Sequence, residues 1–545
     1  MSDDNNNVIS LADRKRIRAL AKAELAPPVI SFENGQGLIQ ATEPALGMLD
    51  QEGDRHGIAV FANRFVRPVR AIRESRQGVD GEAVETVEFA AFTTPDFIAA
   101  LGKGLQFERV TKSMTAQGVF TRTAAVDCPT NVANAMLAQA DLCQGIVIER
   151  NALTPILRGT TLHAKAGHSR ALRAWIQSPE LTLPVTLNKD AAVFALARVR
   201  SWLADFPFAS DTDESAAVAM LLTAAMRASL TRAPGFLCVK PEYGSGASTL
   251  CSLAHIIQTG NPAAVLGTSR GGDELTKTLD AIQMAALPAI VLDNVQRGAS
   301  LSSEALAQIL TEPYRQVRIL GQSKSVTVPN TQLVLVNGNN IAVAADLVRR
   351  FIRVQLGAIE KPTARQFERP DLLLDAQRER ADILADLFTI VIAYRLSNAA
   401  SATERIAYDN WSESIAAPLV WLGMPDPTLT QRDIESDDSE REFHRALLHC
   451  WFRLHGNSVL PAKQLLATDS GEQFALVNEL REVIDDYCGK SDARAIGMTL
   501  NGFVDSTIDG MRIRKLGVNK GVMRWQLVGE PSESISALED DAWLA

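Results

Sequence analysis

The stretch GFLCVKPEYGSGASTLCSLAHII, residues 235–257, decides the fold class of this protein. An apolar run that predicts a β-strand is followed by a turn with two glycines, Gly244 and Gly246, and then by a helical pattern. A strand, a glycine turn and a helix in this order can surround a phosphate with backbone N–H groups at the helix N-terminus. The same three elements also occur as a purely structural turn, so the surrounding sequence has to decide between the two interpretations.

The turn departs from the phosphate-loop pattern at one position. The pattern G-x-x-x-x-G-K-[ST] requires a lysine after the last glycine, and this chain has Ala247 there. Ser248 follows, at the position whose hydroxyl would hold Mg²⁺. The missing group is therefore the ammonium that reaches the β- and γ-phosphates.

The residues downstream of this turn alternate between short apolar runs and helical stretches. AAVLGTS, AIVLDNV, QVRILG and TQLVLVNGNN read as strands, whereas DELTKTLDAIQMAA and SSEALAQILT read as helices. Strands that alternate with helices indicate a parallel sheet covered by helices. The predicted fold class is therefore α/β.

Polar residues follow the predicted strands where a phosphate site would need them. Asp293 follows the apolar part of AIVLDNV, where a carboxylate can lie beside Mg²⁺, although a buried strand can also end in an ordinary loop aspartate. Amides at the end of LVLVNGNN can orient an attacking water or simply form a turn; they are Asn337, Asn339 and Asn340. Arg349 and Arg350 are candidates for an arginine finger in a neighbouring subunit's site, or for a solvated helix end.

Composition limits the remaining possibilities. The 545 residues predict two to four domains, and a net charge of -9 excludes a global field that draws the chain to nucleic acid. None of the six cysteines forms a C-x-x-C pair, which favours buried reduced thiols. The N-terminus is polar and acidic rather than a signal peptide, and no apolar run reaches the roughly 18 residues of a membrane span. These features predict a cytoplasmic protein.

The sequence resembles the helicase-type ATPases of replication and primase-helicase proteins from phages and integrated mobile elements, which are related to superfamily-three and virus-type AAA+ helicases. The resemblance covers about residues 28–528. It is carried by VFANRFVRPVR, NALTPILRG, LADFPF, PEYGSGAST, IVLDNV, LTEPYRQVRILGQS, VNGNN and DLVRRF, in this order. The family implies a P-loop AAA+ core, ATP and Mg²⁺ as cofactors, and assembly as a ring, commonly a hexamer, around single-stranded DNA.

The resemblance assigns roles to residues that match the family's motifs. The residues expected to line the phosphates are Gly244, Ser245, Gly246, Ala247, Ser248 and Thr249. Ser248 and Asp293 are expected to hold Mg²⁺, and Asn339 to act as the sensor. Arg350 fits the arginine finger best, with Arg349 as the alternative. The run VRILGQSKSVTVPN resembles a hairpin that lines the channel, which places Lys324 near its tip for contact with DNA phosphates.

Three positions depart from the family pattern. Ala247 replaces the phosphate-binding lysine. Asn294 follows Asp293 where many related ATPases have a second acid, so the group that activates water is open. Gly159 stands where relatives tend to carry an aspartate. The alanine is interpreted either as a natural loss or as a lysine replaced on purpose.

The resemblance and the patterns together predict the domain organisation. We expect a polar tail with a basic helix at 1–27, an α+β module at 28–185, an AAA+ core at 186–375, a helical domain at 376–455, a winged helix at 456–528 and an acidic disordered tail at 529–545. The wing, MRIRKLGVNKGVMRWQLV, carries candidate DNA contacts, namely Arg512, Arg514, Lys515 and Lys520. The same run is also compatible with a solvated β-ribbon, and the acidic tail with a partner-docking segment.

These observations predict an ATP-dependent, ring-forming DNA helicase or translocase of a phage or mobile element, with hydrolysis impaired by Ala247. The alternative is a non-hydrolysing DNA-binding ring, scaffold or replication-initiation regulator that keeps the ATPase fold. Asp293, VNGNN and RRF favour the first interpretation, and Ala247 favours the second.

Overall fold

The computed structural model consists of two compact units. Unit 1 comprises Met1–Ile341 with Arg350–Gln431, and unit 2 comprises Ala342–Arg349 with Arg432–Ala545. The residues that the structure describes are 27–33, 37–73, 84–240, 245–262, 266–267, 272–295, 300–319, 324–339, 341–357, 367–401, 403, 408–431, 439–466, 474–488, 493–504, 507–519 and 522–530. Within these ranges, no helix is both long enough and apolar enough to cross a membrane.

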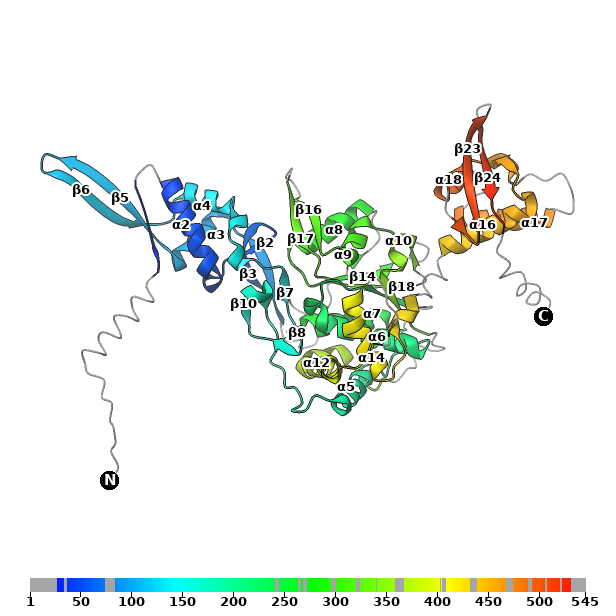
Figure 1. Cartoon of the computed structure of the whole chain (residues 1–545), viewed down its shortest axis with the longest axis horizontal. Coiled ribbons are helices and arrows are strands. Elements are labelled where there is room, and N and C mark those ends of the chain that lie inside the picture. Colours follow the sequence, from blue (N-terminus) through cyan, green and yellow to red (C-terminus); the bar gives the residue numbers. More distant parts are fainter. Residues whose placement is uncertain are drawn as a thin grey trace, which may run out of the picture. The chain divides into compact units, whose positions relative to one another are not determined.

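A five-stranded parallel sheet forms the centre of unit 1 (Figure 1). Its order is β13 (Leu266–Gly267), β14 (Ala289–Val295), β18 (Leu333–Asn339), β12 (Gly235–Lys240) and β20 (Phe351–Gln355). Every neighbouring pair is parallel. The predicted α/β class with a parallel sheet is therefore confirmed.

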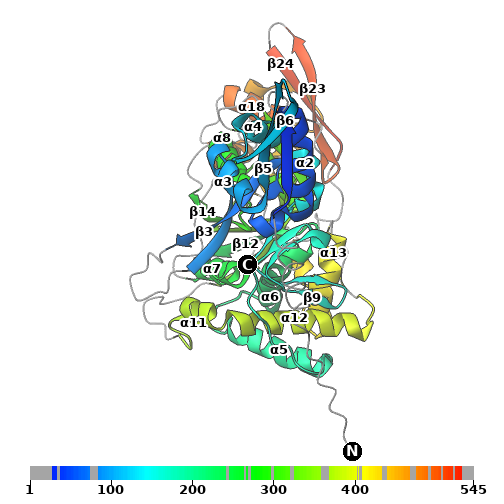
Figure 2. The ribbon, with the colours of Figure 1, turned by 90° about the vertical axis from the view of Figure 1, so that its left-hand side faces the viewer.

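Helices pack on this sheet through one large apolar cluster. The helices of this cluster are α5 (Lys189–Ser201), α6 (Asp211–Met226), α7 (Ala247–Thr259), α11 (Leu372–Arg378), α12 (Arg380–Ser397) and α14 (Ala417–Trp421). Unit 1 also contains the helices α8 (Gly272–Met284) and α9 (Glu304–Thr311). The run ESAAVAMLLTAAMRASL is apolar nearly all round and predicts a buried helix, and α6 is indeed buried from Ser215 to Met226. Figures 1 and 2 show α5 and α12 side by side.

The N-terminal part of unit 1 has its own core. A three-stranded sheet of β1 (Val29–Glu33), β5 (Gln106–Thr115) and β6 (Gly118–Val126) packs with helices α2 (Gly37–Glu52), α3 (Thr94–Gly104) and α4 (Thr130–Leu137). Beside them lies the antiparallel sheet β2 (Ala59–Phe61), β3 (Arg64–Arg73) and β4 (Val84–Ala91), followed by the short strands β7 (Arg150–Ala152), β8 (Ile156–Arg158), β9 (Thr161–His163), β10 (Gly167–Ser169) and β11 (Ala174–Ile176).

The antiparallel sheet of β2, β3 and β4 packs against a hairpin that lies far away in the sequence. This hairpin is β16 (Tyr314–Arg318) with β17 (Ser325–Pro329), where the sequence predicts two β runs around a turn. Phe61 and Phe89 share a buried cluster with Val317 and Val328 of the hairpin. The base of the hairpin is therefore held by apolar packing as well as by the backbone hydrogen bonds between β16 and β17.

Unit 2 combines helices with an antiparallel sheet around a separate core. Its principal helices are α16 (Ser439–His455), α17 (Phe474–Cys488) and α18 (Ala493–Gly502). The sheet order is β21 (Val459–Pro461), β24 (Val522–Val528), β23 (Met511–Asn519) and β22 (Thr507–Ile508). Helices followed by a β-ribbon are the pattern on which the winged-helix prediction rests.

Five of the cysteines lie in described side chains, and all five are buried and free. Burial raises the pKa of the thiols of Cys128, Cys143 and Cys450 to about 12. These thiols therefore remain protonated and unreactive at neutral pH, as the sequence predicts.

Candidate functional site

The turn before α7 requires a glycine at its last position. Gly246 precedes the first helical residue, Ala247, and has a φ of 95°. A side chain there would meet a second obstacle, since a Cβ on Gly246 would lie 3.1 Å from Cε1 of Phe206. Because glycine offers no side-chain cap, the first backbone N–H groups of α7 are not capped by residue 246. A helix N-terminus of this kind favours an anion.

Three segments distant in sequence meet next to this helix N-terminus. The Ser248 hydroxyl in α7 donates to Oδ1 of Asp293 in β14 at 3.0 Å. It also lies 3.5 Å from Oδ1 of Asn337 in β18. Asp293 is half-buried and Asn337 is buried. A hydroxyl, a carboxylate and an amide thus converge at one point.

The strand order explains why these side chains meet. Strand β18 lies between β14 and β12, and the ladders β14·β18 and β12·β18 are both parallel. Their carboxyl ends therefore lie at one edge of the sheet, and α7 begins at the same edge because only six residues separate it from the end of β12. In open α/β sheets, ligands bind at this carboxyl edge.

The other residues predicted to line a phosphate differ in what the structure describes of them. Ser245 is buried, Thr249 is half-buried, and the Ala247 methyl lies in the large apolar cluster. Gly244 lies outside the described residues.

Of the asparagines at the end of β18, Asn337 has a described side chain, and this side chain contacts the site. Asn339 pairs through its backbone with Lys240, while its side chain, like that of Asn294, falls outside the described part. Asn340 lies outside it as well. The sensor role of Asn339 and the effect of Asn294 therefore stay predictions. The contact that the structure describes is the one between Asn337 and Ser248.

The candidate arginine fingers lie on either side of a unit boundary. Arg349 belongs to unit 2 and is exposed, whereas Arg350 belongs to unit 1 and is half-buried. The Arg350 carbonyl accepts from the Gly235 N–H at 2.9 Å, which fixes its backbone beside β12. A role in the site of a neighbouring subunit stays a prediction for both.

The predicted DNA contacts are in different environments. Lys324 is exposed and directly precedes β17, and its carbonyl accepts from the Ile319 N–H at 3.0 Å. In unit 2, Arg512 and Arg514 alternate with buried Met511 and Ile513, so they share one face of β23 as predicted.

The last two predicted contacts differ from these arginines. The Lys515 ammonium donates to Oδ1 of Asn501 at 2.7 Å and lies 5.6 Å from the ring centroid of Trp525. Lys515 is therefore already held within unit 2, whereas Lys520 lies outside the described residues.

Sequence reasoning missed Phe206, whose ring lies against Gly246. The segment LADFPF carries part of the resemblance, which assigns no role to Phe206. An aromatic pair around a proline was the available signal, but the contact between Phe206 and the turn depends on tertiary packing.

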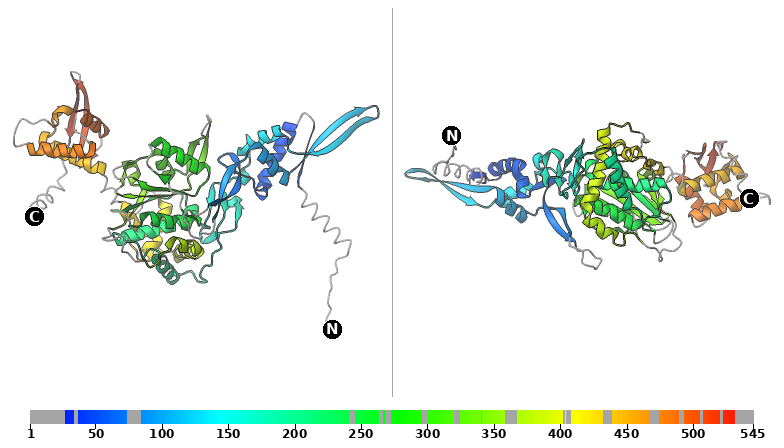
Figure 3. Two further views of the ribbon diagram at one scale, coloured as in Figure 1. Left: turned by 180° about the vertical axis from the view of Figure 1, so that it is seen from behind. Right: turned by 90° about the horizontal axis from the view of Figure 1, so that it is seen from below.

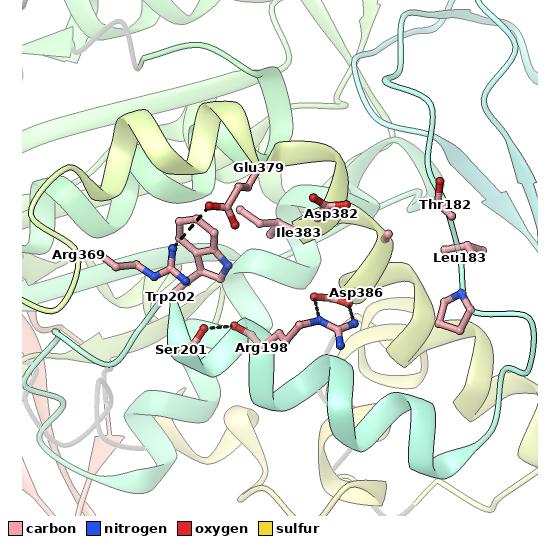
Figure 4. A pocket seen from close by; sticks show the side chains of 12 residues that line it. Thr182, Leu183, Arg198, Ser201, Trp202, Arg369, Glu379, Asp382, Ile383 and Asp386 are labelled. Carbon is pink, nitrogen blue, oxygen red and sulfur yellow. Dashed lines mark hydrogen bonds and ion pairs between the residues drawn. The ribbon is translucent and has the colours of Figure 1, made fainter.

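A separate cavity of about 490 Å³ lies between α5 and α12 (Figure 4). Two ion pairs lie in its wall: Arg198 donates to both oxygens of Asp386 through Nε and Nη2, which form one edge of its guanidinium, and Nη1 of Arg369 lies 3.9 Å from Oε1 of Glu379. The Arg369 guanidinium also lies 3.9 Å from the Trp202 ring centroid. The ion pair between Arg198 and Asp386 therefore joins α5 to α12. The lining of this cavity, as far as the structure describes it, does not bring a hydroxyl, a carboxylate and an amide to one point as the site at Ser248 does.

Comparisons with known proteins give little further information. No family model matches this sequence, and no curated protein matches it. Among solved structures, the chain is similar to the apo C-terminal region of NrS-1, with 12% sequence identity, coverage of 79% of this chain and 98% of that chain, and a TM-score of 0.33. A TM-score this low does not establish a shared fold, so function has to be inferred from the site.

Proposed function

We propose that this protein binds ATP with Mg²⁺ at the carboxyl edge of the central sheet and acts on DNA as a ring-forming helicase or translocase. The observation that carries the proposal is the contact between Ser248 and Asp293, with Asn337 beside it, at the N-terminus of α7. Sequence resemblance and geometry support the same nucleotide site.

The residues at this edge fit a magnesium ion. Mg²⁺ takes oxygen ligands and usually binds through one or two carboxylates together with substrate phosphates and waters. Ser248 and Asp293 present a hydroxyl and a carboxylate 3.0 Å apart, so both oxygens can face one ion. When bound, the ion would neutralise charge on the phosphates. The α7 N–H groups would bind the phosphate oxygens, and the Asn337 amide would orient a water.

The rate of ATP hydrolysis that we expect depends on Ala247. A lysine there would stabilise charge that builds up during phosphoryl transfer, and removal of one such group typically lowers the rate by about 10²–10³. We therefore propose that the chain binds nucleotide but hydrolyses it slowly. The second candidate function is a non-hydrolysing DNA-binding ring or scaffold, which the alanine favours.

DNA is the proposed macromolecular partner. Lys324, exposed directly before β17, and the Arg512–Arg514 face of unit 2 supply positive charge on a chain whose net charge is -9. Local charges of this kind contact phosphates rather than bases. We also propose that the chain assembles as a hexameric ring with single-stranded DNA in its channel. The acidic tail would bind a protein partner.

The test compares the native chain with four variants, Ser248→Ala, Ser252→Ala, Asp293→Asn and Ala247→Lys. Binding of a fluorescent ATP analogue is measured with Mg²⁺ and with EDTA, and DNA-stimulated hydrolysis is measured in parallel. We expect Ser248→Ala and Asp293→Asn to weaken Mg²⁺-dependent binding about tenfold or more. Ser252, one turn further along α7, is the matched control and should have no effect.

Hydrolysis separates the two candidate functions. Turnover that emerges only in Ala247→Lys supports a helicase core with a disabling substitution. Binding without turnover in either form supports the scaffold. If Ser248→Ala and Ser252→Ala bind the nucleotide equally well, the proposed site is wrong.

A further inference from the structure

Strands β5 and β6 continue as a two-stranded arm beyond the sheet to which they belong (Figures 1 and 3). Strand β1 pairs with β5 only over Gln106–Val110, whereas the β5·β6 ladder continues to the pair Thr115 and Gly118. The residues of β6 from Gly118 to Ala125 are exposed. A two-stranded hairpin gains little stability by itself, which suggests that the arm exists to contact something.

One face of this arm carries positive charge and an aromatic ring. We name it the arginine face. In the antiparallel register, paired residues point to the same side, so this face consists of Arg109, Thr111, Ser113 and Thr115 from β5, and Gly118, Phe120, Arg122 and Ala124 from β6. It contains two arginines, one phenylalanine, three hydroxyls and no acid.

The two arginines lie close together without a neutralising partner. Arg109 is opposite Ala124 and Arg122 is opposite Thr111, so the arginines are diagonal neighbours with Cβ atoms roughly 7–8 Å apart. Both side chains are exposed, and neither has a hydrogen bond or ion pair to another described residue. Like charges at this separation repel each other, and an anion bound between the two guanidinium groups would offset this repulsion.

Phe120 extends the charged pair towards the tip of the arm. It lies opposite Ser113, two residues along β6 from Arg122 on the same face, and 52% of it is exposed. Its neighbours on this face are hydroxyls rather than aliphatic groups, so the face lacks the apolar core of a protein interface. An exposed ring beside arginines is the combination that binds single-stranded nucleic acid, because bases stack on the ring and phosphates bind the guanidinium groups.

The opposite face of the arm differs in charge. Glu108 lies there together with Lys112, whose ammonium forms an ion pair with Glu33 of β1. Met114 and Val119 are on the same face near the tip. The unpaired positive charge of the described arm is therefore confined to the arginine face.

We propose that the arginine face is a binding site for single-stranded nucleic acid, with Arg109 and Arg122 on adjacent phosphates and Phe120 stacked on a base. The site adds a contact outside the channel and requires no nucleotide at Ser248. The choice of DNA as the probe rests on the proposed function.

The test uses the full chain without ATP and a fluorescein-labelled oligo-dT of about 30 nucleotides, with binding followed by anisotropy between about 50 and 200 mM salt. Replacing both Arg109 and Arg122 by glutamine should weaken binding about tenfold at low salt. It should also lower the slope of log affinity against log salt by about 1.4, since each phosphate contact on a single strand contributes about 0.7. Phe120→Ser should weaken binding about tenfold and leave the slope unchanged.

Lys112→Gln is the matched control, because it removes one charge from the opposite face of the same arm. It should change the affinity less than about twofold. Circular dichroism and sedimentation accompany each variant. The proposal is overturned if the double arginine variant binds like the native chain, if Lys112→Gln weakens binding as much as the double arginine variant, or if only the oligomeric state changes, which would make the arm a contact between copies. Since no ATP is present, loss of the nucleotide site leaves this result unaffected.

Discussion

The stability of unit 2 is expected to fall as the pH is lowered from 7.5 to 5, because of one buried histidine. His444 in α16 is 2% exposed, and its ring stacks on Phe503 with centroids 4.1 Å apart. Its Nε2 has no hydrogen-bond partner within the part of the chain that the structure describes. Burial lowers the pKa of His444 from 6.5 to about 4.

The sign of the effect follows from where the proton binds. Between pH 6.5 and pH 4 the unfolded chain takes up a proton at this position, whereas the folded chain does not, so lowering the pH favours unfolding. With about 1.36 kcal/mol per pH unit below 6.5, the loss is about 2 kcal/mol at pH 5 and approaches about 3 kcal/mol near pH 4. Above pH 7 the contribution is constant.

Urea denaturation of the full chain at pH 7.5 and pH 5 measures this loss, with the unfolding of unit 2 followed by tryptophan fluorescence. Trp451 and Trp525 are both buried in the core of unit 2 and contribute to the signal together with the tryptophans of unit 1, so the comparison with a His444 variant assigns the pH-dependent part to unit 2. His444→Phe keeps a stacked ring and removes the titrating group, so its pH dependence should be smaller by about 2 kcal/mol. Equal pH dependence of the native chain and the variant would refute the reasoning.

Three further substitutions test other contacts. Gly246→Ala forces a side chain onto a φ of 95° and against Phe206, so we expect a loss of about 1–3 kcal/mol in urea denaturation and weaker binding of ATP; native-like behaviour in both would contradict the role of the turn. Arg227 is fully buried and donates to three backbone carbonyls, so Arg227→Met should cost about 3 kcal/mol, and a loss below about 1 kcal/mol would show that these bonds matter little. Thr223→Val removes the acceptor of the buried Trp411 indole N–H at 2.8 Å and should lower the free energy of unfolding by about 1–3 kcal/mol, whereas an unchanged melting temperature would argue against it.

Much of the core was predictable because its signals are local. The strand before Lys240, the glycine at residue 246 and the helix after it depend on residues within a few positions of one another. The same holds for α6, whose apolar composition predicts burial without reference to any partner. The residues at the ends of β14 and β18 could be singled out because polar side chains after apolar strands are conspicuous in the sequence.

The geometry of the site could not be predicted in the same way. Ser248 and Asn337 lie 89 residues apart, and nothing in VNGNN by itself indicates that the Asn337 amide contacts Ser248. That contact depends on the register of β18 against β12 and β14, which is a long-range property. The packing of Phe206 on Gly246 depends likewise on contacts between distant segments.

The sequence by itself determined the class of fold, the position of the glycine turn and the absence of its lysine, because each of these is a property of neighbouring residues. Only the tertiary structure decided that Ser248, Asp293 and Asn337 meet, since parallel strands bring their carboxyl ends together from positions 248 to 337 in the chain. It also decided that Arg109 and Arg122 share one face of an exposed arm, because a strand register places side chains on a face. Ala247 accordingly has a defined place, one residue before the hydroxyl that contacts Asp293.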